Sequence, residues 1–383
     1  MKIFMKTPKL LFLVNVDWFF ISHRLPIAIE ALSKGYEVHV ATTVTSKRAM
    51  LEELGLIVHG IDISRSSTSI YAALKNLLEI ISLFRRIKPN IVHLVTIKPI
   101  LLGGIAARIA KVDGVVAAIS GLGFVFIDQG YFAELRRLFV KIIYRISLGH
   151  HNLQIICQNV NDFQVIKEIT DLPDTAFSLI NGSGVSLEQF KYVPLDAQQI
   201  PKIIMASRLL KDKGVNEFVA AAKIVKNSNI KAKFILVGEP DPENPSSIEM
   251  GVIDGWIESE TIEYWGQRED MHNVLSQATI VVLPSYREGF PKILIEAAAC
   301  GRAVITTDVP GCRDAIYNNI TGLLVPSKDI EALAQALQRL VSNLSHCHTM
   351  GLEGRKMAEE KFDSNIITAE HFCIYNQLLS NIK

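Results

Sequence analysis

The sequence predicts an α/β protein with two doubly wound parallel sheets, and two observations support this. Short apolar runs rich in β-branched residues alternate with helix-like stretches through both halves of the 383-residue chain. Hydrophobic residues make up 49% of the chain, which is enough for two cores of ordinary size. We therefore expect two Rossmann-like domains whose functional groups gather at the carboxyl ends of the strands.

The first half alternates strand-like and helix-like stretches. The strand-like runs are short and apolar, as expected for strands that are buried on both faces. The expected strands span 9–16, 36–42, 56–61, 90–96, 115–119 and 153–157, and the expected helices span 23–34, 46–54, 70–87, 99–111 and 131–148. Repeated units of this length predict one parallel sheet.

A polar stretch at 186–202, which contains Pro194 and Pro201, separates the two halves and marks the domain boundary. The second half then repeats the pattern. The expected strands span 203–206, 232–237, 279–283 and 303–306, and the expected helices span 214–226, 268–277, 291–300, 328–343 and 364–381. We assign 1–190 and 200–362 to the two domains, and 363–383 to a C-terminal helix that packs back on the first domain.

Composition excludes several classes of protein. The net charge is +1, which gives no indication of nucleic-acid binding. The five cysteines are odd in number and form no Cys-x-x-Cys pair, so a reducing cytoplasm fits best. The apolar start of the chain predicts a first strand rather than a signal peptide, and no segment has the roughly 18 apolar residues of a membrane-spanning helix.

Two carboxylates flank a Gly-Phe-Pro turn between an expected strand and an expected helix. Glu288 precedes the helix, and Glu296 lies inside it, eight positions later. Pro291 suits the first turn, whose free N–H groups and helix dipole favour an anion. One carboxylate can accept hydrogen bonds from sugar hydroxyls and the other from a ribose, with a diphosphate between them. The segment therefore predicts a site for a nucleotide sugar.

Three further segments of the second half, each at a strand end, contain residues that can contact a ligand. Arg208 and Lys213 lie in one strand-to-helix loop, where two cations can neutralise a diphosphate, although basic loop residues are usually only solvated. Gly238 follows the next strand and permits close backbone approach to a ligand. Gly266 and Gln267 can frame a nucleobase, and a plain turn is the alternative.

The notable segment of the first half follows the strand 115–119. Ser120, Gly121 and Gly123 leave room there for a sugar or a pyrophosphate, and the aromatic residues that follow can flank an acceptor. A tight turn with core aromatics is the alternative interpretation.

Taken together, these segments resemble glycosyltransferase family 4, whose members are retaining enzymes of the GT-B architecture. The resemblance rests on Ser207-Arg208 with Lys213-Gly214, on 284–291, on Ile295-Glu296-Ala297 and on 307–313. Gly121-Leu122-Gly123, Ile127-Asp128-Gln129-Gly130 and 242–246 are most similar to the bacterial members that extend undecaprenyl-diphosphate-linked sugars, of the diacetylbacillosamine-diphosphoundecaprenol α-1,3-N-acetylgalactosaminyltransferase type.

The resemblance implies two domains that face each other across a cleft, the N-terminal one binding the acceptor and the C-terminal one binding a UDP-sugar. Arg208 and Lys213 would bind the UDP phosphates, and with Glu288 they would form the catalytic set. Glu296 would bind the ribose. The donor sugar would lie against Glu288 and the backbone of Gly289, Phe290 and Pro291.

Two departures from the family pattern concern the acceptor side. Ser120 stands where many members carry a histidine, which removes the usual candidate for a general base. The first strand runs into Val16-Asp17-Trp18 rather than a Gly-Gly turn, so Trp18 joins the acceptor-side residues. The family's same-face attack, in which a phosphate oxygen of the leaving group takes the proton, fits a site without a base. The chain has no Asp-x-Asp triplet, so we expect no metal and activity that survives EDTA.

The expected function is transfer of an N-acetylhexosamine, in first place GalNAc, to an undecaprenyl-diphosphate-linked glycan for O-antigen, capsule or protein glycosylation. Alternatives are a family 4 transferase with a soluble acceptor, a UDP-sugar 2-epimerase and a non-catalytic sugar-nucleotide-binding protein. A lipid acceptor requires contact with the inner face of the cytoplasmic membrane. The basic amphipathic stretch 131–148 can lie in that interface, or it can be an ordinary surface helix.

Overall fold

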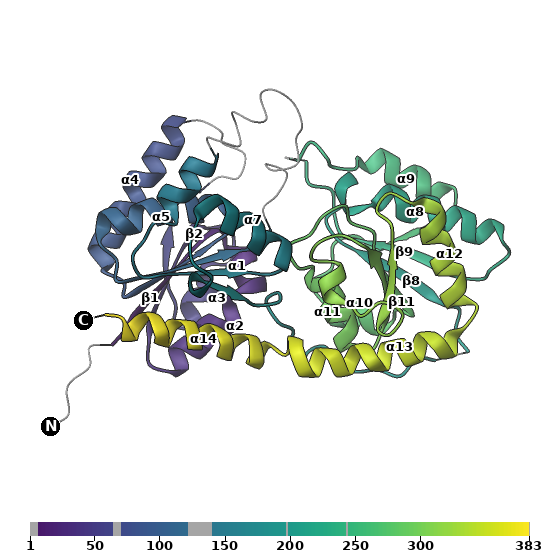
Figure 1. The fold of residues 1–383 in the computed structure, drawn as a ribbon. Helices are drawn as coiled ribbons and strands as arrows, with labels where there is room; N and C mark the ends of the chain where they lie inside the picture. The colour runs from purple at the N-terminus through teal and green to yellow at the C-terminus, as the bar shows by residue number, and fades with distance from the viewer. Residues whose placement is uncertain (1–6, 64–69, 122–139, 197, 243, 383) are drawn as a thin grey trace. The chain divides into compact units, whose positions relative to one another are not determined.

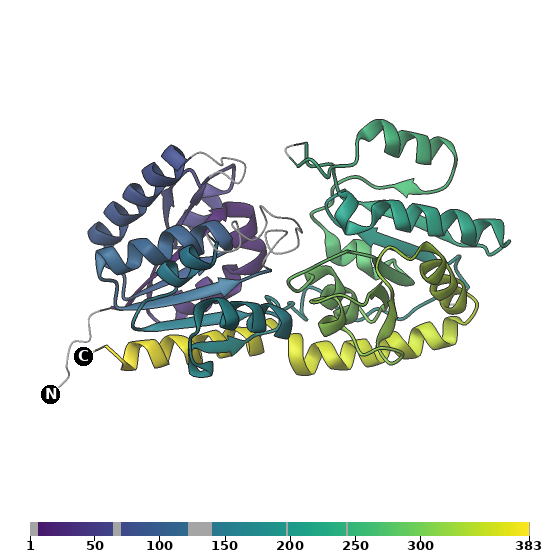
Figure 2. The ribbon, with the colours of Figure 1, turned by 45° about the horizontal axis from the view of Figure 1, so that its top comes forward.

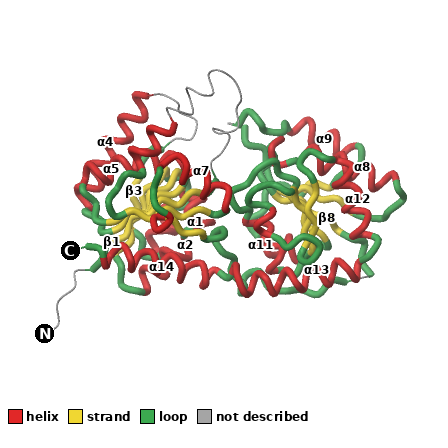
Figure 3. The backbone as a smooth tube through the Cα atoms, in the orientation of Figure 1, coloured by secondary structure: helices red, strands yellow, loops and turns green. Residues whose placement is uncertain are grey.

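The computed structural model describes residues 7–63, 70–121, 140–196, 198–242 and 244–382 and divides the chain into two compact units. Unit 1 comprises Met1–Ser183 and Asn365–Lys383, and unit 2 comprises Gly184–Ser364. In each unit a central group of strands lies among helices (Figure 3). The boundary between the units falls before the proline-containing stretch 186–202, so that stretch belongs to unit 2.

Unit 1 contains a seven-stranded parallel sheet in the order β3-β2-β1-β4-β5-β6-β7. Its strand order reverses direction between β1 and β4. The strands are β1 Lys9–Val16, β2 Glu37–Thr43, β3 Ile57–Gly60, β4 Ile91–Val95, β5 Gly114–Ile119, β6 Leu153–Cys157 and β7 Phe177–Leu179. The apolar runs of the sequence form these strands because helices cover both faces of the sheet.

Two helical layers enclose this sheet (Figures 1 and 2). The first layer consists of α4 Ile70–Ile87, α5 Ile97–Ala110, the helical segment 140–147 and α7 Val160–Thr170. The second consists of α1 Asp17–His23, α2 Leu25–Ser33, α3 Arg48–Glu53 and the C-terminal α14 Ser364–Ser380. The expected helix 23–34 corresponds to α2, and α1 is an additional helix that ends just before it. Pro26 lies in the first turn of α2, where it has no N–H to lose.

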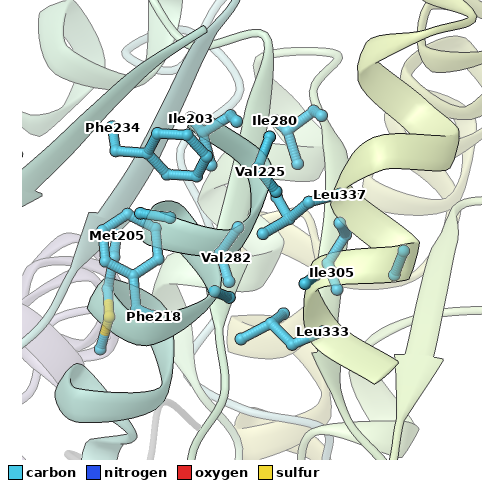
Figure 4. Packing of buried hydrophobic residues seen from close by; sticks show 14 of the residues in the cluster. Ile203, Met205, Phe218, Val225, Phe234, Ile280, Val282, Ile305, Leu333 and Leu337 are labelled. Atoms are coloured by element: carbon cyan, nitrogen blue, oxygen red, sulfur yellow. The ribbon is translucent and has the colours of Figure 1, made fainter. Parts of the chain in front are cut away.

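Unit 2 contains a six-stranded parallel sheet in the order β10-β9-β8-β11-β12-β13. The strands are β8 Lys202–Ala206, β9 Lys233–Val237, β10 Glu263–Tyr264, β11 Ile280–Leu283, β12 Ala303–Thr307 and β13 Gly322–Val325. One face carries α8 Val215–Asn227, α9 Met250–Glu258 and α12 Ile330–Val341, and the other carries α10 Met271–Ser276 and α11 Lys292–Ala299. Phe218, Phe234 and Leu337 belong to the core under α8 and α12 (Figure 4).

Several elements of the structure have no counterpart in the expected pattern. They are α1, α7, β7, α9, β10, β13 and α13 Leu344–Met357. His346-Cys347-His348, which the pattern places between helices, lies inside α13, where Asn343 caps the first turn. The described residues contain no group of metal-ligating side chains. No helix among them combines the length and apolar character that crossing a bilayer requires.

Candidate functional site

The candidate site lies at the carboxyl ends of β8 and β11, the two central strands of the unit 2 sheet. Ile203 of β8 pairs with Ile280 of β11, and the sheet order reverses direction between these strands. The loops that follow them therefore diverge, and such a switch point is where doubly wound sheets bind ligands. The loop 207–214 follows β8, and the loop 284–291 follows β11. Lys213 of the first loop and Glu288 of the second meet at this point.

Lys213 and Glu288 form an ion pair at the centre of the site. The Lys213 Nζ lies 2.5 Å from Glu288 Oε1, and the two side chains are 17% and 13% exposed. The Ser285 hydroxyl donates to the same carboxylate oxygen at 2.6 Å. A cation and a carboxylate are thus held, largely out of solvent, at a switch point, where both can exchange partners with a polar ligand.

A glycine lets the two loops approach each other. Gly214 has a φ of +77°, and a Cβ at this position would lie 2.2 Å from the backbone oxygen of Pro284. Only glycine fits this position. Tyr286 locks the loops further, because its N–H donates to Asp212 O at 2.9 Å and its hydroxyl donates to Glu217 Oε1 at 2.6 Å. The position of Lys213 relative to Glu288 is therefore fixed by the backbone as well as by the ion pair.

The loop after β12 packs against the backbone of the Glu288 loop. Gly311 has a φ of +80°, and a Cβ there would lie 2.4 Å from Gly289 O and 2.7 Å from Glu288 O. The Thr307 hydroxyl also donates to the backbone oxygen of Ser285. The sequence includes Gly311 in a family-like segment but gives it no role, so its support of the Glu288 loop is a finding of the structure.

The helix α11 begins immediately after the Glu288 loop. Pro291 is extended, with φ −76° and ψ 113°, and precedes the helix rather than opening its first turn, and no side chain caps this end. Glu296 lies one turn into α11 and pairs with Lys292 at 3.1 Å, with its side chain 9% exposed. Burial raises the pKa of Glu296, and Lys292 partly opposes that shift. The helix end thus offers N–H donors beside a carboxylate.

Arg208 and Gly238 lie where the loops after β8 and β9 meet. Arg208 is about half exposed and pairs with Asp241 at 2.9 Å rather than with the Lys213–Glu288 pair. Gly238 has a φ of +132°, and a Cβ there would lie 1.9 Å from Ser207 O, so this glycine permits contact between loops. The Gln267 amide, assigned with its nitrogen toward Glu239, lies 2.8 Å from both carboxylate oxygens. These residues line the flank of the site rather than its centre.

The candidate acceptor residues belong to unit 1. Trp18 is 43% exposed in α1, directly after β1. The neighbouring Asp17 is fully buried and accepts from Thr45 N at 2.7 Å and from the Thr45 hydroxyl at 2.8 Å, which fixes this turn. Ser120 and Gly121 follow β5, and Gly121 has a φ of +112°. Gly123 lies outside the described residues.

Thr96, which the sequence does not single out, directly follows β4 at the switch point of the unit 1 sheet and is the N-cap residue of α5. Its φ is +73°, an uncommon conformation for a β-branched residue. Its hydroxyl is buried and has no hydrogen-bond partner among the described residues. Backbone strain of this kind concentrates at functional positions. Thr96 therefore joins Trp18 and Ser120 as a candidate acceptor-side residue.

Two family models match the chain. Residues 9–159 match the model described as glycosyl transferase 4-like, and residues 200–343 match the model described as glycosyl transferases group 1. The chain is 29% identical to the N,N'-diacetylbacillosaminyl-diphospho-undecaprenol alpha-1,3-N-acetylgalactosaminyltransferase of Campylobacter jejuni, over 94% of this chain and 96% of the relative. It is 28% identical to the capsular polysaccharide biosynthesis glycosyltransferase CapM of Staphylococcus aureus, over 98% of each.

Solved structures show the same fold. A glycosyltransferase of Rickettsia africae aligns with a TM-score of 0.79 at 18% identity, covering 98% of this chain and all of that chain. The Anabaena protein HepE in complex with UDP aligns with a TM-score of 0.75 at 16% identity, covering 96% and 99%. The expected fold class, two Rossmann-like parallel-sheet units of the GT-B type, is therefore confirmed.

Proposed function

Because this chain belongs to the family 4 type of glycosyltransferase, we propose that it transfers an N-acetylhexosamine, in first place GalNAc, from a UDP-sugar to an undecaprenyl-diphosphate-linked glycan. The observation that carries the donor half of this proposal is the Lys213–Glu288 ion pair at the β8–β11 switch point. The activity named for the Campylobacter jejuni relative supports the choice of acceptor and sugar. The UDP bound to HepE supports the choice of nucleotide.

The diphosphate of the donor needs positive charge on more than one side. Lys213 supplies one cation from its largely buried position, and the uncapped first turn of α11 supplies N–H donors. Arg208 supplies a second cation if it exchanges Asp241 for a phosphate, which its half-exposed side chain permits. Glu296 then accepts from the ribose, and Glu288 with the backbone of 289–291 holds the sugar.

Transfer breaks the bond between the sugar C1 and the UDP oxygen. Positive charge develops on the sugar ring and negative charge on the leaving diphosphate, so stabilising that diphosphate is the main catalytic task. The acceptor hydroxyl attacks C1 from the face that UDP leaves, and its proton passes to the departing phosphate oxygen. This route retains the configuration at C1 and needs neither a protein base nor a metal. It suits a chain that carries Ser120 where a histidine is frequent.

A lipid-linked acceptor requires the enzyme to work at the inner surface of the cytoplasmic membrane. Arg145 is exposed and Lys141 is half-buried on the helical segment 140–147, beside Ile142 and Ile146, which are 47% and 46% exposed. The opposite face, with Tyr144, is buried against the sheet. Basic and apolar side chains on one exposed face favour an interfacial helix. The rest of the proposed membrane stretch, 131–139, lies outside the described residues.

The decisive experiment screens UDP-GalNAc, UDP-GlcNAc, UDP-Gal and UDP-Glc against short polyprenyl-diphosphate sugars and determines the linkage of the product. The proposal is supported if the wild type forms product with a lipid acceptor, Lys213→Ala does not, and Lys211→Ala does. Lys211→Ala is the control because Lys211 is an exposed lysine of the same loop. Product only with soluble acceptors, UDP-sugar interconversion without an acceptor, or UDP binding without turnover each favours one of the three alternatives.

Membrane contact has its own test. Vesicle flotation compares the wild type with a charge-reversal variant of Arg136, Arg137, Lys141 and Arg145. Loss of flotation on anionic vesicles supports contact through 131–148, and unchanged flotation rejects it.

A further inference from the structure

A cavity of about 380 Å³ opens beside β3, the edge strand of the unit 1 sheet. It lies between this strand and the helices α3 and α4. The volume is near the lower end for small-molecule sites, which suits one sugar ring rather than an oligosaccharide. The polar and glycine residues that line it are Arg48, His59, Gly60, Glu79, Ser82 and Arg86.

Two arginines lie at one end of this cavity, and one of them, Arg48, is paired with a carboxylate. Arg48 reaches the edge of β3, where its Nη2 donates to Val58 O at 3.2 Å, and its Nε donates to Glu52 at 2.9 Å. Arg86 comes from the last turn of α4 and has no ion-pair partner in the part of the chain that the structure describes. An arginine that is not neutralised beside a cavity is suited to a phosphate or a carboxylate, which it can bind through two parallel hydrogen bonds.

A relay of side chains fixes the histidine between these arginines. His39 lies 2.8 Å from Glu37 through Nε2 and 3.0 Å from His59 Nε2 through Nδ1. If Nε2 of His39 donates to Glu37, then Nε2 of His59 donates to His39, and Nδ1 of His59 is left as an acceptor. Burial, together with His39, Arg86 and Arg48, lowers the pKa of His59 to about 4. His59 is therefore neutral and oriented, and two cations act on it.

The other end of the cavity carries a carboxylate. Glu79 and Arg86 are seven residues apart on α4, so they lie on one face of the helix about 10 Å apart along its axis. Ser82 lies between them on that face and adds a hydroxyl. A ligand that fills the cavity therefore meets positive charge at one end, and acceptors of hydroxyl protons at the other.

We propose that this cavity is a second ligand site, which binds a small polyhydroxylated anion of the sugar phosphate class. The phosphate lies at Arg86 and Arg48, and the sugar hydroxyls donate to Glu79 and to Nδ1 of His59. The inference is independent of the proposed transfer reaction, because it rests on residues of unit 1 that take no part in the donor site.

The test is titration calorimetry of the full chain with glucose 6-phosphate, inorganic phosphate and glucose. We expect both phosphates to bind and glucose not to bind. Arg86→Gln should weaken glucose 6-phosphate binding at least about tenfold, the effect of one lost charge-assisted hydrogen bond. Arg85→Gln is the matched control, since Arg85 is the exposed neighbour on α4 outside the cavity, and it should bind as the wild type does.

Three further measurements test whether this cavity is a ligand site of its own. Glu79→Gln should weaken binding of glucose 6-phosphate and not of inorganic phosphate. The pKa of His59, followed by NMR of its ring, should rise when phosphate binds, because the anion offsets Arg48 and Arg86. Lys213→Ala should leave glucose 6-phosphate binding unchanged. No binding of either phosphate at millimolar concentration, or equal binding by Arg86→Gln and the wild type, overturns the proposal.

Discussion

Lys213 and Glu288 come from loops at the ends of two adjacent strands and meet at 2.5 Å with both side chains more than four-fifths buried. Such a pair has a large effect when one partner is removed, because the remaining charge stays buried without compensation. The pair therefore links the stability of unit 2 to the proposed diphosphate site.

The first prediction concerns the coupling between these two residues. Lys213→Ala and Glu288→Ala should each lower the free energy of unfolding by about 3 kcal/mol, and the double variant should lose clearly less than the sum. Transfer activity should fall at least about a hundredfold in each single variant. Urea denaturation and a transfer assay measure the two effects, with Lys211→Ala as control. Additive losses of stability would contradict the coupling.

The second prediction concerns Gly311, which supports the Glu288 loop. Gly311→Ala should destabilise unit 2 by about 2 kcal/mol or more, because alanine disfavours a φ of +80° and its Cβ would overlap Gly289 O. Gly255→Ala is a control of opposite sign: it lies in α9 with open space around its Cβ position and should stabilise by roughly 0.5–1 kcal/mol. Thermal unfolding of both variants measures these effects. Equal stability of Gly311→Ala and the wild type would show that Gly311 does not support the Glu288 loop.

The third prediction separates stability from function at Glu296. Burial raises the pKa of Glu296 in the folded protein above its value in the unfolded chain. At a pH between these two values, the folded protein therefore keeps the proton that the unfolded chain releases. The stability that Glu296 contributes in its protonated form is therefore lost as the pH rises through the folded-state pKa. Glu296→Gln should raise the melting temperature at neutral pH, and the gain should shrink toward pH 4.

The same substitution should weaken UDP binding about tenfold, because a charged acceptor for the ribose hydroxyls is replaced by a neutral one. Calorimetric titration with UDP measures this effect. A variant that gains stability and keeps full UDP affinity would show that Glu296 does not bind the ribose.

The fourth prediction concerns metal ions. The proposed site neutralises the diphosphate with Lys213, Arg208 and the first turn of α11. Transfer rates should therefore stay the same after dialysis against EDTA, and added Mg²⁺ should not raise them. A rate that falls with EDTA and returns with Mg²⁺ would show that the diphosphate needs a metal.

Helices and strands could be predicted from the sequence where the periodicity of apolar residues is strong. The prediction failed where the residues have a weak propensity for helix or strand. The strands at the centre of each sheet lie within two residues of their expected bounds. The helix α9 was missed because Gly251 and Gly255 lower its helix propensity.

The centre of the candidate site was predictable because its residues follow neighbouring strands. Lys213 and Glu288 follow β8 and β11, which are neighbours in the sheet. The roles of Gly311 and Thr96 depend on a positive φ and on contacts between loops, which no local pattern reveals. The Arg208 partner, Asp241, lies 33 residues away in the next loop, so this pairing also required the structure.

The last prediction concerns the attachment of α14 to the unit 1 sheet. The Tyr375 hydroxyl and His93 Nδ1 lie 2.6 Å apart in a fully buried environment, and they share one hydrogen bond. Tyr375→Phe leaves His93 without that partner, while its Nε2 already has no partner among the described residues. We expect a loss of about 1–3 kcal/mol in the free energy of unfolding, the desolvation penalty of an unsatisfied buried group.

Tyr71→Phe, at a tyrosine that is 80% exposed, should change stability by less than about 0.5 kcal/mol. Urea denaturation compares the two, and equal effects would mean that this hydrogen bond does not hold α14 to the sheet.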